Sequence, residues 1–499
     1  MRRLAAAFET GACSCVQNGE GKLSLFENAI SENAYGYFYE ILKIPHGSGN
    51  EKALSDYLMT FSKEHGLAAV QDGSLNVLIK KPGAKGRENE PPVILQAHMD
   101  MVCEKNAGVK HNFRKDPILP IVDGDWVKAD GTTLGADNAA GLSLIMAILA
   151  SAGLLHPPIE ALITAEEETT MRGAVKFDTS RLLGKRLINL DSESEGIFTT
   201  SSASASDICV SIPIEYEAAP EGFAAYMLVV RGLAGGHSGI DINKGRANAN
   251  VLTARIFSGL EKARIASIDG GLQKNAIPRE CSAVISFDES DSAQIKTAVK
   301  QTESDLKAEY PFDEGLTIEF EKTEFPQKVM SVDSQQKVIS CMLLTPNGVL
   351  SLLPRSHFVQ TSNNLGVVQS DNEAVKLTSF FRSSNIAEQD LAIKNIKRLM
   401  ESHGANVEIN DQSPPWGYRE NSPLRDRLTA AFEELYGKKP VVSAIHAGLE
   451  CAIFAEKIPE GDFISIGMDI TGAHSPDEKM SISSFDRTGG FLIKVLEKL

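Results

Sequence analysis

Four short segments of the sequence place carboxylates, and in one case an imidazole, after apolar runs that predict strands. They are QAHMD (96–100), GADN (135–138), AEEE (165–168) and NLDSE (189–193). A histidine among several carboxylates suits a divalent metal such as Zn²⁺, Mn²⁺ or Co²⁺. A second histidine, His474 in GAHSP (472–476), would complete a set for two metals. Each segment alone is a weak signal, because a strand-end Asp more often caps a helix, but their succession in one chain favours a metal site.

These side chains can meet only if their strands end at one edge of a sheet. Strand-like runs at 76–79, 93–96, 159–164 and 187–190 alternate with helical periods at 48–66 and 142–152. Ser48 and Glu51 fit a capping box at the start of the first helix. The alternation predicts an α/β domain with a mixed, mainly parallel sheet, in which ligands gather outside the carboxyl ends of the strands.

The composition changes near residues 199–206 and again near 412, which indicates a chain that leaves the first domain and returns to it. We expect an N-terminal extension at 1–29, a catalytic domain in two parts at 30–204 and 413–499, and a large inserted α+β lid domain at 205–412. The returning part begins with a helix after Ser422-Pro423, a typical N-terminal pair.

The chain has 499 residues, 42% of them hydrophobic, and a net charge of −16. That charge argues against nucleic acid or an anionic membrane surface as the main partner. No run approaches the roughly 20 apolar residues of a membrane-spanning helix. Seven scattered cysteines without a CxxC pair favour a reducing compartment, so we expect a cytoplasmic protein.

Longer motifs extend the pattern. The chain resembles the aminoacyl-histidine dipeptidases (Xaa-His or cytosolic non-specific dipeptidases, peptidase D), a branch of the two-zinc aminoacylase/carboxypeptidase-like exopeptidases. The resemblance covers about residue 30 to the C-terminus. It is carried by LQAHMDMV (95–102), GTTLGADNAAG (131–141), INLDSE (188–193), GLAGGHSG (232–239), AIHAGLECA (444–452) and GAHSPDE (472–478).

The resemblance implies a two-metal site. In it, His98 and Asp191 bind one ion, Glu168 and His474 bind the other, and Asp137 bridges both together with a water or hydroxide. Zn²⁺ is the first expectation, with Co²⁺ or Mn²⁺ as alternatives. Two such ions lower the pKa of a shared water and polarise the scissile carbonyl.

Two further residues in these segments receive roles from the resemblance. Asp100 orients the His98 imidazole, and Glu167 is the general base that moves protons between water and the leaving amine. The chain has three successive glutamates where the family usually has two, followed by a small residue and Gly. The flanking LIT (162–164) and MRGA (171–174) place the active pair at 167 and 168, and Thr170 stands in place of the Gly.

The inserted domain and the last part of the chain add substrate contacts. In the family, the histidine that matches His237 stabilises the oxyanion of the tetrahedral intermediate, and the position of Arg382 binds the free carboxylate of the substrate. Both roles imply that the lid closes over the metal domain. Glu450 could receive the α-ammonium group of a peptide, but His446 and Glu450 stand one turn apart and could instead pair with each other.

The resulting prediction is a metal-dependent hydrolase of dipeptides with a free N-terminus, Xaa-His dipeptides included. Two alternatives stay open at this point: an amidohydrolase acting on N-acyl amino acids, and an inactive homologue that binds metal or peptide. The expected partners are small peptides, and the resemblance also suggests a homodimer, although no sequence pattern locates its interface.

Overall fold

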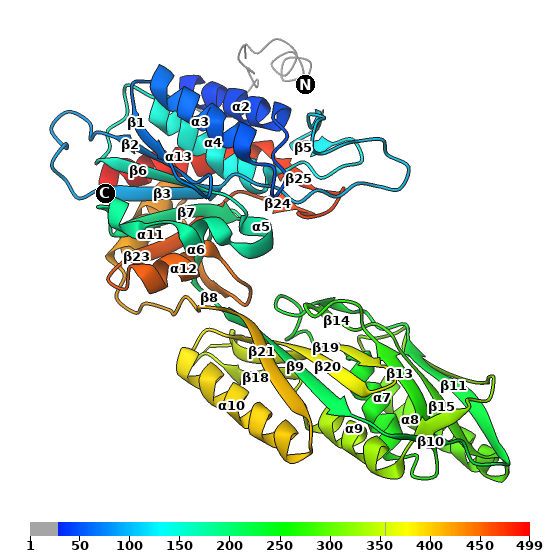
Figure 1. Cartoon of the computed structure of the whole chain (residues 1–499). Helices are drawn as coiled ribbons and strands as arrows, with labels where there is room; N and C mark the ends of the chain where they lie inside the picture. The colour runs from blue at the N-terminus through cyan, green and yellow to red at the C-terminus, as the bar shows by residue number, and fades with distance from the viewer. Residues whose placement is uncertain (1–27, 355) are drawn as a thin grey trace. The chain divides into compact units, whose positions relative to one another are not determined.

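The computed structural model describes residues 28–354 and 356–499 of the chain. Within these ranges the chain forms two compact units (Figure 1). Unit 1 contains the described residues up to Thr200 with Tyr418–Ser443 and Leu449–Leu499, and unit 2 contains Ser201–Gly417 and Ala444–Gly448. The predicted extension at 1–29 lies outside the described residues except for its last two, and the predicted domain boundaries stay predictions.

Unit 1 is built on a mixed sheet that is parallel at its centre. The strand order is β1 (Ala68–Gln71), β2 (Val77–Lys81), β6 (Ile159–Thr164), β3 (Val93–His98), β7 (Arg186–Ser192), β23 (Asp462–Gly467), β8 (Ile197–Ser202) and β22 (Val441–Ile445). Strands β6, β3, β7 and β23 run parallel, whereas β1, β2 and β8 pair in antiparallel fashion. The predicted α/β class with a mixed, mainly parallel sheet is confirmed.

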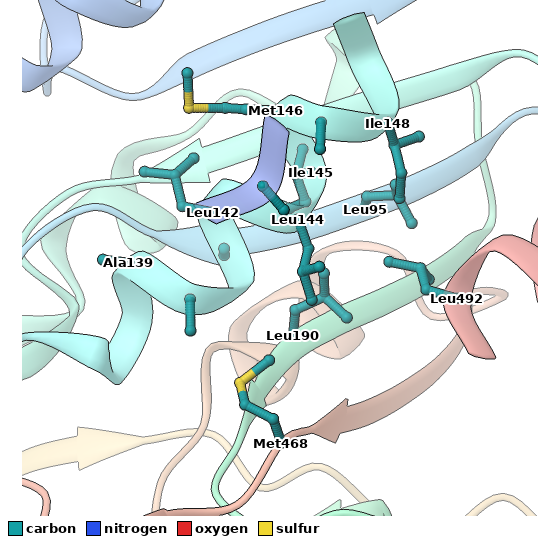
Figure 2. Packing of buried hydrophobic residues seen from close by; sticks show 14 of the residues in the cluster. Leu95, Ala139, Leu142, Leu144, Ile145, Met146, Ile148, Leu190, Met468 and Leu492 are labelled. Atoms are coloured by element: carbon teal, nitrogen blue, oxygen red, sulfur yellow. The ribbon is translucent and has the colours of Figure 1, made fainter. Parts of the chain in front are cut away.

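Helices cover both faces of this sheet. They are α2 (Asn28–Lys43), α3 (Lys52–Glu64), α4 (Ala136–Ala150), α5 (Glu167–Thr170), α6 (Arg172–Lys176), α11 (Pro423–Tyr436), α12 (Glu450–Lys457) and α13 (Ile482–Lys498), with a short 3₁₀ turn at Thr179–Arg181. Helix α4 is apolar on all sides because it is enclosed by β3, β7 and α2. Figure 2 shows Ile145 and Ile148 of α4 in one cluster with Leu95 of β3 and Leu190 of β7.

The predicted capping box of the first helix is wrong. Helix α3 begins at Lys52, and its N-cap residue Glu51 makes no side-chain cap bond. The Ser48 hydroxyl instead donates to Asp100 Oδ2 (2.8 Å), and Glu51 Oε1 accepts from the amides of Gly49 (2.9 Å) and Glu166 (3.2 Å). Ser48 therefore binds a distant residue, and Glu51 binds one amide close in sequence and one far from it, and neither side chain caps the helix.

A small antiparallel sheet adjoins the core of unit 1 and holds the segment of the second predicted histidine. Its order is β24 (Ile470–Thr471), β25 (Lys479–Ser481), β5 (Trp126–Ala129) and β4 (Pro120–Asp123). The loop 472–478 connects β24 to β25 and carries His474. This loop is closed by a turn in which the Glu478 amide donates to the Ser475 carbonyl (3.1 Å).

Unit 2 has its own antiparallel sheet and its own hydrophobic core. The strand order is β16 (Thr317–Lys322), β11 (Phe223–Arg231), β15 (Cys281–Asp288), β13 (Arg264–Gly270), β19 (Val359–Ser370), β20 (Ala374–Ser383), β9 (Ser204–Pro213) and β21 (Asn406–Ser413), and β18 (Gly348–Leu352) pairs with β19. The helices are α7 (Ala249–Ser258), α8 (Ser292–Glu309), α9 (Val332–Leu344) and α10 (Ile386–Ser402). Short ladders join β10 (Tyr216–Ala218) to β17 (Lys328–Met330) and β12 (Gly236–His237) to β14 (Ala276–Ile277), and a 3₁₀ turn spans Glu289–Asp291.

Among the helices of residues 28–354 and 356–499, none combines the length and the apolar character needed to cross a membrane.

Candidate active site

The carboxyl ends of three neighbouring parallel strands bring the predicted metal ligands of unit 1 together. Strand β3 ends at His98, β7 carries Asp191 near its end, and β6 leads into α5, which starts at Glu167. Because β6, β3 and β7 are adjacent and parallel, these side chains meet at one edge of the sheet. Asp137 reaches the same edge from the start of α4.

The two imidazoles lie on opposite sides of the Asp137 carboxylate. His98 Nε2 is 3.1 Å from Asp137 Oδ1 and 3.2 Å from Asp191 Oδ1. His474 Nε2 is 3.3 Å from Asp137 Oδ2 and 3.0 Å from Glu168 Oε2. Asp137 thus offers one oxygen to each of two half-sites, which we call half-site A (His98, Asp137, Asp191) and half-site B (Asp137, Glu168, His474).

The residues of both half-sites fit divalent cations. In each half-site the potential ligand atoms lie within 4.8 Å of one another. Glu168 Oε1 is buried and has no hydrogen-bond partner within the described residues, so its acceptor capacity is open to a cation. Three carboxylates with two imidazoles form the donor set that borderline divalent metals prefer. Glu167 also lies within ligand distance of His98 and Glu168, so proximity does not separate it from the ligands.

The electrostatics of the cluster also favour a bound positive charge. Hydrogen bonds to Asp137 and Glu168 raise the pKa of His474 to about 11, although partial burial opposes this. Burial raises the pKa of Asp191 to about 6. Crowded carboxylates favour the cationic form of a neighbouring imidazole. The same negative charges would attract a divalent cation.

Asp100 holds both His98 and the turn that carries the two glutamates. Its Oδ1 accepts from the Glu167 amide (2.9 Å) and lies 3.5 Å from His98 Nδ1. Its Oδ2 accepts from the Glu168 amide (3.2 Å) and from Ser48 (2.8 Å). The His98 Nδ1 position, close also to the Asp100 carbonyl (3.1 Å), leaves Nε2 directed at the half-sites.

The three successive glutamates at 166–168 differ in where their side chains lie, in the register expected from the flanking segments 162–164 and 171–174. Glu166 has a left-handed backbone (φ 54°), and its side chain pairs with Arg172 away from the cluster. Glu167 and Glu168 then point to the metal-ligand group. Burial raises the pKa of Glu167 well above its ordinary value, and the nearby Asp191 and Glu168 charges act in the same direction. Glu167 is therefore a carboxyl that holds a proton readily.

Glu450 does not lie where a substrate ammonium group could reach it in this structure. It is 0% exposed at the start of α12. Its Oε2 accepts from Gln96 (2.6 Å) and Thr164 (2.7 Å), and burial raises its pKa to about 8. His446, the alternative partner that the sequence offers for Glu450, contacts the Ser362 hydroxyl through Nε2 (2.7 Å) within unit 2.

The remaining predicted residues form a second cluster inside unit 2. His237 Nδ1 accepts from the amides of Gly239 (3.2 Å) and Ile240 (3.1 Å), which places the imidazole proton on Nε2. Arg382 is 4% exposed, lies over the Phe380 ring (4.5 Å), and approaches His237 Nε2 to 3.5 Å with Nη2. In this tautomer both nitrogens carry protons, so the two groups lie side by side with neither accepting from the other.

The charge of this second cluster stays positive at neutral pH. Burial lowers the pKa of Arg382 to about 10, so the guanidinium is still protonated. Burial lowers the pKa of His446 to about 3, so this imidazole is neutral. The Nε atom of Arg382 and the Nδ1 atom of His446 are buried without partners in the described residues. A buried guanidinium N–H without a partner, as at Arg382, is typical of a site for a small anion, whereas His446 Nδ1 is a donor only in one of the two neutral tautomers.

Sequence reasoning missed three residues that hold the unit 1 cluster. Ser48 and Glu51 were assigned to a helix cap, and Glu478 received no role although it belongs to GAHSPDE. All three are buried or partly buried carboxylates or hydroxyls that bind backbone amides or side chains of the ligand-bearing segments. Neither Glu51 nor Glu478 has a local sequence signal for this role, because the ligand-bearing segments whose amides they bind lie far along the chain.

Comparison with known proteins identifies the family. The model of peptidase family M20/M25/M40 matches residues 94–498. The chain belongs to this family. It is therefore a peptidase, a hydrolase of peptide bonds, as expected from the motifs.

Three similar proteins match this M20/M25/M40 peptidase over almost its whole length. The cytosol non-specific dipeptidase of Escherichia coli (strain K12) is 37% identical over 467 residues, which are 93% of this chain and 96% of that protein. The crystal structure of aminoacylhistidine dipeptidase from Vibrio alginolyticus matches with a TM-score of 0.86 and 35% identity, over 95% of this chain and 99% of that one. Aminopeptidase PepT from Bacillus cereus shares the fold at 15% identity, with a TM-score of 0.56 over 94% of this chain and 98% of that one.

Proposed function

We propose that this peptidase is a metal-dependent dipeptidase that hydrolyses dipeptides with a free N-terminus, Xaa-His dipeptides included. Two observations outside the site support the substrate class. The Escherichia coli relative is a non-specific dipeptidase and the Vibrio alginolyticus relative is an aminoacylhistidine dipeptidase, and both align over more than nine tenths of the chain.

The observation that carries the metal dependence is the position of Asp137. One of its oxygens faces His98 and the other faces His474, so two cations, Zn²⁺ above all, would share this carboxylate. Asp191 would complete half-site A, and Glu168 would complete half-site B. When bound, such a pair of cations lowers the pKa of water toward ~7 and polarises a substrate carbonyl.

The side chains around the half-sites perform the proton transfers. Glu167 accepts a proton from the attacking water and later delivers it to the leaving amine, and its raised pKa suits a group that must hold that proton between the two steps. Asp100 keeps His98 Nε2 aimed at half-site A and, through two amide bonds, fixes the turn that carries Glu167.

The unit 2 cluster supplies donors for the two negative charges of a reacting dipeptide. His237 Nε2–H stabilises the oxyanion of the tetrahedral intermediate, and the Arg382 guanidinium binds the terminal carboxylate. The structure supports the His237 role through the two amides that fix its tautomer. Glu450 has no accessible oxygen for the α-ammonium group of the substrate. We propose instead that it holds the ligand-bearing strands in place by accepting hydrogen bonds from Gln96 and Thr164.

The partners, cellular location and assembly of the enzyme are proposed from the same resemblance. We propose small peptides as its partners, the cytoplasm as its location and a homodimer as its assembly. The name of the Escherichia coli relative, a cytosol dipeptidase, agrees with this location.

A peptide panel tests the proposal. Metal-free protein is reconstituted with Zn²⁺, Mn²⁺ or Co²⁺ and assayed on Ala-His, N-acetyl-Ala-His and a tripeptide. We expect turnover of Ala-His that a chelator abolishes, with little or no turnover of the other two. A preference for the acetylated peptide would overturn the dipeptidase assignment in favour of an N-acyl amidohydrolase.

A further inference from the structure

Glu478 is a buried carboxylate that no step of the proposed reaction uses. Its side chain is 2% exposed and lies in unit 1 with the half-sites. Glu478 Oε2 accepts from the amides of Leu134 (2.8 Å) and Gly135 (2.9 Å), and Oε1 accepts from the amide of Asp137 (3.2 Å). Three backbone N–H groups of one short segment thus converge on a single side chain from a distant part of the chain.

The amides of Leu134, Gly135 and Asp137 have no acceptor from a capping side chain at Gly135, although Asn138 Oδ1 accepts from the Gly141 amide (3.2 Å) one turn further on. Helix α4 begins after Gly135, which has a left-handed backbone (φ 75°) and no side chain that could cap the helix. The N–H groups at a helix start have no partner within the helix, and a carboxylate is the acceptor they bind best. A Cβ at Gly135 would meet Met101 Sδ at 2.8 Å, so a larger residue could not provide the cap. Glu478, from a distant part of the chain, supplies the acceptor oxygens for these amides.

The same residue also belongs to the loop of His474. Glu478 follows His474 by four positions, and its own amide closes the loop on Ser475 (3.1 Å). One side chain therefore ties the loop that carries His474 to the backbone that carries Asp137. The two ligands joined in this way lie 3.3 Å apart, from His474 Nε2 to Asp137 Oδ2.

We propose that Glu478 is a positioning residue that sets the geometry of half-site B by joining the Asp137 backbone to the His474 loop. The inference rests on the proposed function for its two-metal centre. Half-site A depends less on Glu478, because His98 and Asp191 stand on β3 and β7 and are fixed by the sheet itself. Loss of the Glu478 contacts therefore lowers the affinity for the ion in half-site B far more than the affinity for the ion in half-site A.

Glu478→Gln is the sharpest variant, with Glu160→Gln as its matched control. A glutamine has a single acceptor oxygen, so its NH₂ group must face either the Asp137 amide or the amides of Leu134 and Gly135. Glu160 is also 2% exposed in unit 1 and accepts from the amides of Leu183 (2.9 Å) and Gly184 (2.8 Å), but it contacts no half-site residue. The control thus removes a buried, amide-binding carboxylate without changing the metal ligands.

The readout is metal binding itself, measured on the full chain with Zn²⁺ by equilibrium dialysis and with Co²⁺ by visible absorption. We expect two ions per wild-type chain and per Glu160→Gln chain with equal affinities. In Glu478→Gln the first ion should bind as in wild type, and the affinity for the second should fall at least tenfold, as is typical when a partner of a ligand is lost. Excess metal should restore the second ion's Co²⁺ absorption.

Four outcomes decide against the proposal. Wild-type affinity for both ions in Glu478→Gln would overturn it, as would an equal loss in Glu160→Gln. If Glu478→Gln does not fold, Glu478→Asp, whose side chain is one methylene shorter, is measured in its place. Wild-type affinity of Glu478→Asp for the second ion would likewise overturn the proposal. A wild-type chain that binds fewer than two ions would overturn the metal centre and this role with it, whereas a failed dipeptide assay would leave the binding test unaffected.

Discussion

Replacement of Asp100 by Asn tests how the ligands are held in place. Asp100 accepts from the amides of Glu167 and Glu168 and from Ser48, and faces His98 Nδ1. An asparagine oxygen can keep the contacts of Oδ1, to Glu167 and His98. Its NH₂ group then faces the Ser48 hydroxyl, which can turn to accept, and the Glu168 amide, which cannot.

The expected cost follows from that single unpaired amide. A buried N–H without an acceptor costs about 1–3 kcal/mol, and the lost charge weakens the bond to His98 further. At 1.4 kcal/mol per factor of ten, Asp100→Asn should lower metal affinity and kcat/KM by about 10–100-fold. Metal affinity is measured by competition with a chelator, and kcat/KM on Ala-His at saturating metal.

Asp462→Asn is the matched control for this experiment. Asp462 is another buried carboxylate of unit 1 that accepts from a serine hydroxyl, Ser422 (2.6 Å), and a backbone amide, Leu424 (2.9 Å). It lies at the start of β23, away from the ligand-bearing strand ends. The control should retain wild-type metal affinity. An Asp100→Asn enzyme within twofold of wild type in both metal affinity and kcat/KM would refute the reasoning.

Three further predictions concern the proton carrier, the second half-site and a buried carboxyl. Glu167→Gln should lower kcat by about 10²–10⁴-fold at full metal occupancy, and a wild-type rate in a fully metallated variant would exclude Glu167 as the base. His474→Ala should lose one of two ions by elemental analysis, with activity falling by orders of magnitude; retention of both ions would contradict half-site B. The pKa of Glu450, raised from 4.5 to about 8 by burial, means that the folded state holds a proton which the unfolded state releases, so this group's contribution to stability is full below pH 4.5 and is lost as pH rises toward 8. In urea unfolding of metal-free protein, Glu450→Gln should therefore gain on the order of 2–4 kcal/mol over wild type between pH 5 and pH 8, and parallel pH profiles would disprove the burial effect.

Local sequence patterns predicted the elements whose signals are local. The run 159–164 corresponds to β6, and Ser422, Pro423 and the later Gly437 bound α11, where Ser422 caps the Arg425 amide and Gly437 adopts a left-handed backbone. In these cases the residues that define the element also supply its hydrogen bonds. The strand-end segments likewise pointed to one edge of a parallel sheet, and the structure brings their side chains together there.

Patterns failed where a distant partner competes with a local one. Ser48 and Glu51 have the spacing of a capping box, but Asp100 and the Glu166 amide, both far along the chain, bind them instead. Glu478 shows no spacing signal toward residues 134–137, more than 340 positions earlier. Nothing in the sequence order predicts which carboxylate will accept a given buried amide, because that depends on how the two segments pack.

The most direct test of the account is the position of metal in crystals of the protein grown with Mn²⁺ and measured for anomalous scattering. The account predicts two peaks in each chain, on either side of the Asp137 carboxylate. One should lie among His98 and Asp191, and the other among Glu168 and His474. A single peak, or a pair of peaks that leaves Asp137 uncoordinated, would contradict the two-metal centre on which the proposed reaction depends.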